Sequence, residues 1–217
     1  MIKNNVAVVT AGLCGNNNGY RFQQKNYNSL LINGYVQDNK AIPEAKNILV
    51  LEGYDGLGGD RSLAYEALKN NKEIIKKIQD IKEKVILFIA SGGGTTGSAC
   101  IPLLADIACQ LKDKIVCAVL VMPRRDEPIQ KRLNAYNTAK ELMEIDEMGA
   151  IFLVNNEYST DLDKINFHLV NMLDAFFTDN STSSASNFDD SENIKCCQIM
   201  AAFILLCVVI SQIRQKK

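Results

Sequence analysis

Six short apolar runs, each closely followed by glycine, asparagine or proline, most constrain the fold of this chain of 217 residues. They are residues 6–10 (VAVVT), 30–32, 48–51 (ILVL), 85–90 (VILFIA), 115–122 (IVCAVLVM) and 151–154 (IFLV). Such β-branched runs without alternation are typical of strands buried on both faces of a parallel sheet. Segments with helical spacing separate them, at 61–70, 72–84, 98–112, 128–148 and 162–177. The alternation predicts an α/β fold with a doubly wound, mostly parallel sheet.

Composition excludes several classes of function. The net charge is −1 and no basic stripe is present, so direct nucleic-acid binding is not expected. His168 is the only histidine, which excludes a histidine-based catalytic triad and a multi-histidine metal site. The seven cysteines lack metal-ligand spacing, so no metal ligands are predicted. We interpret the cysteines as small buried hydrophobes of a cytoplasmic protein.

The residues that follow the predicted strands are the candidates for ligand binding. Glycine, asparagine, proline or arginine follows the predicted strands at 12–16, 33, 56–59, 92–98, 123–125 and 155–156. Ligands of open parallel sheets bind beyond the carboxyl ends of the strands. Several such loops at one edge therefore predict a cup of backbone N–H donors around a polyanion.

Residues 91–98 (SGGGTTGS) would form the centre of this cup. Adjacent glycines allow phosphate oxygens to approach the backbone, and the next helix would direct its N-terminus there, with Ser98 as a favourable N-cap. No Gly-Lys-Ser/Thr follows, so this is not a Walker A loop. Gly12, Gly15 and Gly19 do not have the spacing of a dinucleotide fingerprint. The alternative is a flexible glycine turn.

These motifs resemble those of the tubulin/FtsZ superfamily. Residues 11–19 (AGLCGNNNG) resemble the first nucleotide loop of tubulins, and residues 92–98 are similar to the glycine-rich signature of the superfamily. Residues 33–38 (NGYVQD), 51–60 and 123–124 resemble the TubZ-like bacterial and phage branch. The resemblance covers residues 5–193, with the motifs in the same order.

The resemblance implies a GTPase domain that binds GTP or GDP with Mg²⁺. The first loop would hold phosphates and ribose, the glycine signature the α- and β-phosphates, and the third-strand loop the γ-phosphate. Asn156 and Asn166 would hydrogen-bond the guanine edge, which an amide suits because it both donates and accepts. The alternative for Asn166 is an exposed helical position. The implied binding residues are Gly12, Cys14, Gly15, Asn16, Asn33, Gly58, Gly59, Gly92, Gly93, Gly94, Thr95, Thr96, Gly97, Pro123, Asn156 and Asn166.

The resemblance further implies that catalysis is divided between subunits of a head-to-tail filament. Asp189 and Glu192, in the acidic loop 187–192 (NFDDSE), would position water and Mg²⁺ at the γ-phosphate of the next subunit. The alternative is a solvated acidic loop. Expected partners are copies of this chain or a full-length homologue, with a DNA-binding adaptor by analogy with TubZ. A membrane partner is not expected.

The sequence also departs from the family pattern. Thr96 stands where the signature has glycine, which would strain the loop if that position requires a positive φ. We expect a GTP-binding domain at 1–178, an acidic catalytic-type loop at 179–193 and an apolar remnant of a second domain at 194–217. Within the last, residues 201–211 would be an unpartnered strand, or residues 196–213 a marginal membrane anchor.

Three functions are compatible with these observations. The first is a GTP-hydrolysing protein that assembles into filaments. The second is a truncated, non-hydrolysing regulator that binds nucleotide or caps the filaments of a full-length relative. The third is a dinucleotide-binding oxidoreductase domain, which shares the fold class but is disfavoured by the glycine spacing.

Overall fold

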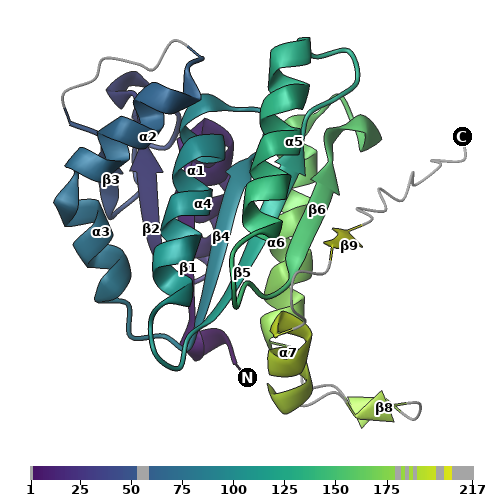
Figure 1. Ribbon diagram of the computed structural model, residues 1–217. Helices are drawn as coiled ribbons and strands as arrows, with labels where there is room; N and C mark the ends of the chain where they lie inside the picture. The colour runs from purple at the N-terminus through teal and green to yellow at the C-terminus, as the bar shows by residue number, and fades with distance from the viewer. Residues whose placement is uncertain are drawn as a thin grey trace, which may run out of the picture.

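A seven-stranded parallel sheet forms the centre of the protein (Figure 1). The computed structural model describes residues 2–52, 59–178, 182–183, 186–187, 190–198 and 203–206. The strand order is β3-β2-β1-β4-β5-β6-β9, and every pair of neighbours is parallel. The strands are β1 Val6–Ala11, β2 Asn28–Asn33, β3 Ile48–Val50, β4 Val85–Ser91, β5 Ile115–Met122, β6 Ile151–Asn155 and β9 Phe203–Leu206. The prediction of a doubly wound parallel sheet is confirmed.

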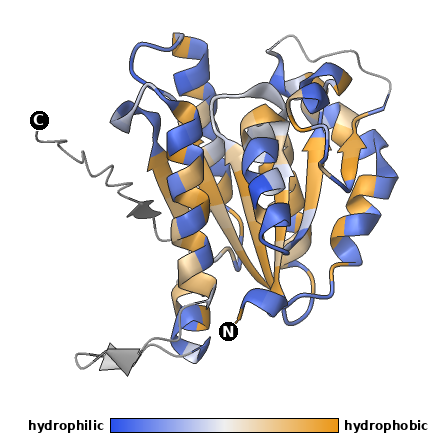
Figure 2. Ribbon diagram, turned by 180° about the vertical axis from the view of Figure 1, so that it is seen from behind, coloured by the Kyte–Doolittle hydropathy of each residue, from blue (hydrophilic) through white to orange (hydrophobic). Residues whose placement is uncertain are grey.

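Helices cover both faces of the sheet. The α-helices are α1 Gly12–Gln24, α2 Arg61–Asn70, α3 Lys72–Gln79, α4 Thr95–Cys109, α5 Ile129–Met143, α6 Leu162–Thr178 and α7 Asp190–Cys197. Short 3₁₀ helices occur at Lys3–Asn5, Val36–Ala41 and Asn156–Tyr158, and β7 Thr182–Ser183 pairs antiparallel with β8 Ser186–Asn187. Helices α2 to α5 lie on one face, and α1 and α6 on the other, where their hydrophilic sides turn away from the apolar strands (Figure 2).

Two hydrophobic cores explain why the strands are apolar without alternation. Val9 and Phe88 pack with α2, α3 and α4, whereas their neighbours Val8 and Leu87 pack with α1 and α6. All four side chains are fully buried. Because both faces are covered, each strand residue is apolar whichever way it points.

The ends of several helices differ from the sequence predictions. Helix α4 begins at Thr95 with Gly94 as its N-cap, so the prediction that Ser98 caps it is wrong. Pro128 is the N-cap of α5 and not part of its first turn. Helices α3 and α5 end earlier than predicted, at Gln79 and Met143. Helix α1 begins where a loop was predicted at residues 12–16, and α7 spans the end of the predicted acidic loop and the start of the predicted apolar remnant.

The C-terminal strand is paired. Phe203–Leu206 lie beside β6 in the register Ile151↔Phe203 to Val154↔Leu206, so the prediction of an unpartnered strand is wrong for these residues. Residues 199–202 and 207–217, which include most of the predicted anchor, lie outside the described residues. In the described part of the chain, no helix is long and apolar enough to cross a membrane.

Asp174 of α6 ties the N-terminus of the chain to the helix layer. Its carboxylate accepts hydrogen bonds from Lys3 Nζ (3.2 Å), Lys25 Nζ (2.8 Å) and the Tyr27 hydroxyl (2.9 Å). Burial opposes ionisation of Asp174, but these three donors outweigh it and lower its pKa. The carboxylate therefore stabilises the fold in its ionised form.

Substituting Asp174→Asn is expected to lower the free energy of unfolding by about 1–2 kcal/mol at pH 7. Because the pKa of Asp174 is lowered by folding, its contribution is present above the unfolded pKa of about 3.9 and is lost as the pH falls through the folded value. Urea unfolding at pH 7 and below pH 4 measures this difference. Asp163→Asn, in the same helix but 79% exposed at its side chain, is the control and should cost less than about 0.5 kcal/mol. Equal costs for the two variants would contradict the assignment.

Candidate functional site

A pocket of about 1050 Å³ opens at the carboxyl ends of the strands, as the sequence predicts. This strand-end pocket lies beside the start of α1 and α4, where the strand order reverses between β1 and β4. Eight of the sequence-predicted residues line it: Gly12, Cys14, Gly94, Thr95, Thr96, Gly97, Asn156 and Asn166. Residues that follow β1, β4 and β6, together with Asn166 of α6, thus meet at one cavity.

Two helix N-termini face the strand-end pocket without side-chain caps. Ala11 precedes α1 and Gly94 precedes α4, and neither supplies a capping hydrogen bond from its side chain. The first amide N–H groups of a helix lack intrahelical partners and carry the positive end of the helix dipole. The two helices therefore offer backbone donors and partial positive charge to an anion in the same cavity.

The loops that lead into α1 and α4 pack so closely that they require glycine. Gly12 has a φ of +73°, and a Cβ on it would lie 3.3 Å from the amide nitrogen of Gly97. A Cβ on Gly97 would lie 2.8 Å from both the Ala11 carbonyl oxygen and the Ala90 Cβ. Side chains at these positions would separate the two helix starts, which explains why both loops contain glycine.

Gly15 and Asn16 lie beneath the strand-end pocket and not in its lining. The fully buried Asn16 accepts a hydrogen bond from Thr10 Oγ1 (2.8 Å) and donates to the Ile32 carbonyl oxygen (3.0 Å), so it joins α1 to β1 and β2. A Cβ on Gly15 would lie 2.5 Å from the Ile89 carbonyl oxygen. Both residues support the first loop from below.

Four more predicted residues also lie outside the pocket lining. A Cβ on Gly92 would lie 3.1 Å from Ala135 of α5, and one on Gly93 would lie 3.4 Å from Pro123. Asn33 donates to Asn39 Oδ1 (2.9 Å) and accepts from the Gly34 amide (3.0 Å), which fixes the second loop. These residues shape the loops that surround the cavity.

Asn166 is buried and connects α6 to the first loop. Its exposed fraction is 6%, and its Oδ1 accepts a hydrogen bond from Asn18 Nδ2 (3.0 Å), which also donates to the Cys14 carbonyl oxygen (2.9 Å). The alternative of an exposed helical asparagine is therefore wrong. With its oxygen occupied, Asn166 has its amide N–H groups available at the pocket.

Cys14 has the chemistry of a neutral thiol. Burial, together with the charge of Glu127, raises the pKa of Cys14 to about 12. Because the thiolate is the nucleophilic form, Cys14 is not an activated nucleophile at neutral pH. Its role at the pocket is therefore one of contact and not of covalent chemistry.

The sequence reading did not single out the charged wall that α5 and the preceding loop give to the pocket. Arg124, Glu127 and Lys131 line the cavity on this side. Glu127 accepts hydrogen bonds from the Arg124 amide (2.8 Å) and from Lys131 Nζ (2.9 Å). Burial opposes ionisation of Glu127, but these bonds outweigh it and lower the pKa of its carboxyl group. The sign of Arg124, Glu127 and Lys131 in the sequence is the run of charged residues after Pro123.

Arg61 is a further residue that the sequence reading missed. It pairs with Glu141 of α5 through Nη2 (2.6 Å) and Nη1 (3.1 Å), and its Nη2 also donates to the Ser98 carbonyl oxygen (2.7 Å). Arg61 thereby holds the start of α2 against α4 and α5. The only sign of this role in the sequence is that an arginine directly follows the glycine-rich residues 51–60.

Thr96 is not strained. It lies in the first turn of α4, and the described non-glycine residues with positive φ are Asn26, Asn47, Asp113 and Glu147. The predicted strain would arise only if this position required a glycine conformation, and α-helical backbone suits threonine. The departure from the glycine signature therefore leaves the loop intact.

Of the two predicted catalytic residues, the structure describes Glu192, which does not line the strand-end pocket. Glu192 lies on α7, and Cys197 of the same helix accepts a backbone hydrogen bond from Ala150 just before β6, at the amino ends of the strands (Figure 1). Asp189 and Gly58 lie outside the described residues. Gly59 has a φ of +84° and does not line the pocket.

Comparison with known proteins identifies the family. The model of the tubulin/FtsZ family GTPase domain matches residues 5–163. The chain belongs to the tubulin/FtsZ family. Tubulin-like protein TubZ from Clostridium botulinum C phage is 24% identical over 209 residues, which cover 93% of this chain and 56% of the relative. Tubulin-like protein CetZ from Pyrococcus abyssi is 28% identical over 161 residues, covering 69% of this chain and 44% of the relative.

Solved structures of the family share the fold of this tubulin/FtsZ domain. A C-terminally truncated phage c-st TubZ superposes with a TM-score of 0.79 at 24% identity, covering 92% of this chain and 67% of that one. A GTPγS-form protofilament of TubZ from Bacillus thuringiensis gives a TM-score of 0.75 at 16% identity, covering 91% and 63%. This chain spans about half the length of the curated relatives it matches.

Proposed function

We propose that this tubulin/FtsZ domain binds GTP and GDP in the strand-end pocket and hydrolyses GTP as part of a head-to-tail filament. The observation that carries the proposal is the convergence of the uncapped starts of α1 and α4 on one cavity. A triphosphate supplies the negative charge and the oxygen acceptors that these amides lack. The Bacillus thuringiensis TubZ structure is a GTPγS-form protofilament, which supports nucleotide binding and filament assembly in the proposal.

The phosphates would lie against residues 94–97 and Gly12. Thr95 and Thr96 can add hydroxyl donors beside the backbone amides, because both line the cavity. Lys131 contributes a cation at the same wall, where its present partner is the carboxylate of Glu127. A phosphate would exchange this exposed ion pair for a charge-assisted hydrogen bond.

The guanine base would lie near Asn156 and Asn166, which line the pocket with the residues at the start of α6. Asn166 would donate its amide N–H to an acceptor on the base edge, because its oxygen already accepts from Asn18. Glu127, whose carboxylate also accepts from the Arg124 amide, would remain an acceptor for a ribose hydroxyl. These contacts would orient the nucleoside while the helix starts hold the phosphates.

The residues present fit a magnesium ion carried by the nucleotide. Asp38 brings a carboxylate to the pocket lining, and magnesium sites of nucleotide enzymes use one or two carboxylates with the substrate phosphates. Among the described residues, no group of three or more His, Cys, Asp or Glu side chains forms a metal site by itself. Bound magnesium would neutralise charge developing on the phosphates.

Hydrolysis would be completed by a neighbouring subunit. Glu192 lies at the amino-end side of the sheet, away from the strand-end pocket of its own chain. A head-to-tail arrangement would bring α7 of one copy to the pocket of the next. Glu192 and Asp189 would then orient the attacking water, so that each site needs two chains.

The test is a dilution series that measures GTP binding and GTP hydrolysis in parallel. Binding per chain should be independent of protein concentration, whereas turnover per chain should rise with concentration and accompany GTP-dependent pelleting. Constant turnover per chain across the series would contradict hydrolysis in trans. Binding without turnover at any concentration would instead favour the non-hydrolysing regulator.

Asn166→Ala is expected to weaken GTP binding about 10- to 100-fold, because it removes the proposed base contact and one of the two hydrogen bonds of buried Asn18. Isothermal titration with GTP and with inorganic triphosphate measures the effect. Triphosphate alone should bind equally to both proteins, since it lacks the base. An equal loss for both ligands would mean that Asn166 acts on the fold of the pocket and not on the base.

A further inference from the structure

A second cavity lies on the sheet face that α2 to α5 cover, and it shares no lining residue with the strand-end pocket. It has a volume of about 1040 Å³ and lies between α2, α4 and α5. Pro102 and Leu103 of α4 and Ile145 after α5 give it apolar lining. The proposed nucleotide chemistry makes no use of this cavity.

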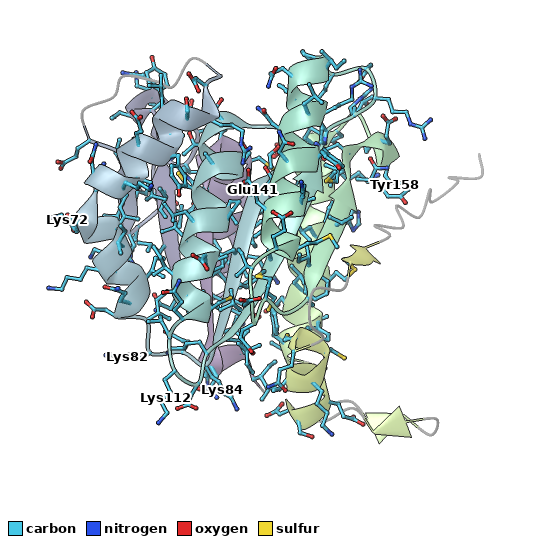
Figure 3. All side chains as sticks on the ribbon, in the orientation of Figure 1. Lys72, Lys82, Lys84, Lys112, Glu141 and Tyr158 are labelled. Atoms are coloured by element: carbon cyan, nitrogen blue, oxygen red, sulfur yellow. The ribbon has the colours of Figure 1, made fainter. Side chains whose placement is uncertain are left out.

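The walls of this cavity are strongly acidic. Among the described residues that line it, Arg61 is the single cation, and it is already paired with Glu141 between α4 and α5 (Figure 3). The carboxylates that line this acidic groove are Glu66, Asp106, Glu141, Glu144, Asp146 and Glu147. A groove with apolar lining and charges of one sign concentrates its field on a ligand of the opposite sign.

The same chain carries a matching basic ridge. Helix α3 buries Ile74 and Ile78 and leaves Lys72, Lys76 and Lys77 exposed. In Figure 3, Lys72 points away from the domain at its edge. These α3 lysines belong to none of the salt bridges that the structure describes. Helix α3 also exposes Glu73, so its three lysines leave it with a net positive charge that complements the groove.

We infer that the acidic groove receives α3 of a second copy of this chain, with the α3 lysines facing the groove carboxylates. Groove and ridge are different surfaces of one molecule, so the contact is heterologous and each copy can bind one neighbour through its groove and another through its ridge. Both lie on the flank of the domain, whereas the proposed head-to-tail contact uses its two ends. The contact therefore joins chains side by side and does not depend on the proposed nucleotide chemistry.

The size of the groove sets the strength of this contact. Fifteen residues line it, whereas a stable interface of standard size uses about 20–30 residues on each side. The association is therefore weak, is driven by charge and is sensitive to salt, because the screening length falls from about 10 Å at 0.1 M salt to about 3 Å at 1 M. In a filament, many such contacts would act together.

The test is a charge exchange followed by sedimentation velocity at low salt without nucleotide. Lys72→Glu/Lys76→Glu/Lys77→Glu and, separately, Glu66→Lys/Glu144→Lys/Glu147→Lys should each weaken self-association at least about tenfold, because like charges then face each other. The chain that carries all six substitutions has the wild-type net charge and restored complementarity. It should associate again, to within about threefold of the wild type.

A matched control separates this contact from a general charge effect. Lys82→Glu/Lys84→Glu/Lys112→Glu changes the net charge as much as the α3 variant does, in a group of lysines at the amino-end side of the sheet (Figure 3). Because the assay contains no nucleotide, the proposed GTP-dependent head-to-tail contact does not form, and this control should leave self-association unchanged. An equal loss in this control would overturn the proposal. So would a wild type that stays monomeric at about 200 μM in low salt, because the proposed contact requires a dissociation constant below this concentration.

A folded six-substitution chain that does not associate would also overturn the proposal. If circular dichroism shows that this chain does not fold, the two triple variants are mixed instead. Each then offers the other a complementary groove and ridge, so they should associate in the mixture and not alone. Mixed variants that remain monomeric would overturn the proposal equally.

Discussion

Replacing Gly97 by alanine is expected to cost about 1–3 kcal/mol of stability and to abolish measurable GTP binding. The new Cβ would lie 2.8 Å from the Ala11 carbonyl oxygen and from the Ala90 Cβ, both parts of the buried sheet. Since β1 and β4 cannot yield, the start of α4 must move away from the start of α1. Equilibrium unfolding and GTP titration of the same variant measure the two effects.

Gly94→Ala is the matched control for this prediction. Gly94 also lines the strand-end pocket, but the atoms nearest to an added Cβ are 3.9 Å away and the backbone has an ordinary φ of −75°. Its stability should therefore equal that of the wild type, while its methyl group hinders a phosphate at the helix start. Gly97→Ala with wild-type stability and wild-type binding would show that the two loops need not touch.

Removing the acidic groups near α7 is expected to stop turnover and leave binding intact. Asp189→Asn/Glu192→Gln should lower GTP hydrolysis about 100-fold or more, since water positioning at the γ-phosphate contributes at least this much. GTP affinity should remain that of the wild type, because Glu192 lies on the side of the sheet away from the strand-end pocket. Single-turnover hydrolysis and GTP titration separate the two quantities.

Mixing variants tests whether the two halves of the site lie on different chains. Gly94→Ala keeps its acidic groups but binds GTP weakly, whereas Asp189→Asn/Glu192→Gln keeps an intact pocket. At a GTP concentration that only the second variant binds, the mixture should hydrolyse GTP faster than the sum of the two proteins alone. A mixture no faster than that sum would contradict catalysis in trans.

The strands were predictable because burial on both faces of the sheet makes every residue of a strand apolar. Residues 115–122 are apolar throughout, and both faces of β5 are covered by helices, so the run in the sequence coincides with the strand. The parallel order then followed from the alternation with helices. The pairing of β9 with β6 was not predictable, since a short apolar run carries no information about its neighbour.

Helix α1 was missed because its sequence consists largely of poor helix formers. Glycine and asparagine make up most of its first two turns, and both disfavour isolated helices. Tertiary packing reverses this preference. Gly19 allows the helix to approach Thr10, and the buried Asn16 and Asn18 exchange local backbone competition for hydrogen bonds with β2 and α6. The glycines and asparagines that made α1 hard to predict are thus the residues that its packing requires.

The candidate site was predictable in its loops but not in its connections. Glycines and amides mark the strand ends in the sequence, whereas the pairing of Arg61 with Glu141 joins residues eighty positions apart and leaves no local trace. The same applies to Asn166 and Asn18, whose contact depends on how α6 crosses α1. The acidic groove likewise exists only once three separate helices have come together.

The open helix starts at the strand-end pocket have a consequence for the life of the protein in the cell. Without an anion, the positive ends of the α1 and α4 dipoles face the same cavity without side-chain caps. On the proposed function, nucleotide would bind the native chain and not the unfolded one, so at 100 times its dissociation constant it would add about 2.7 kcal/mol to stability. The supply of guanine nucleotide would then regulate survival of the polypeptide as well as its activity, and chains deprived of it would be the first to reach proteases.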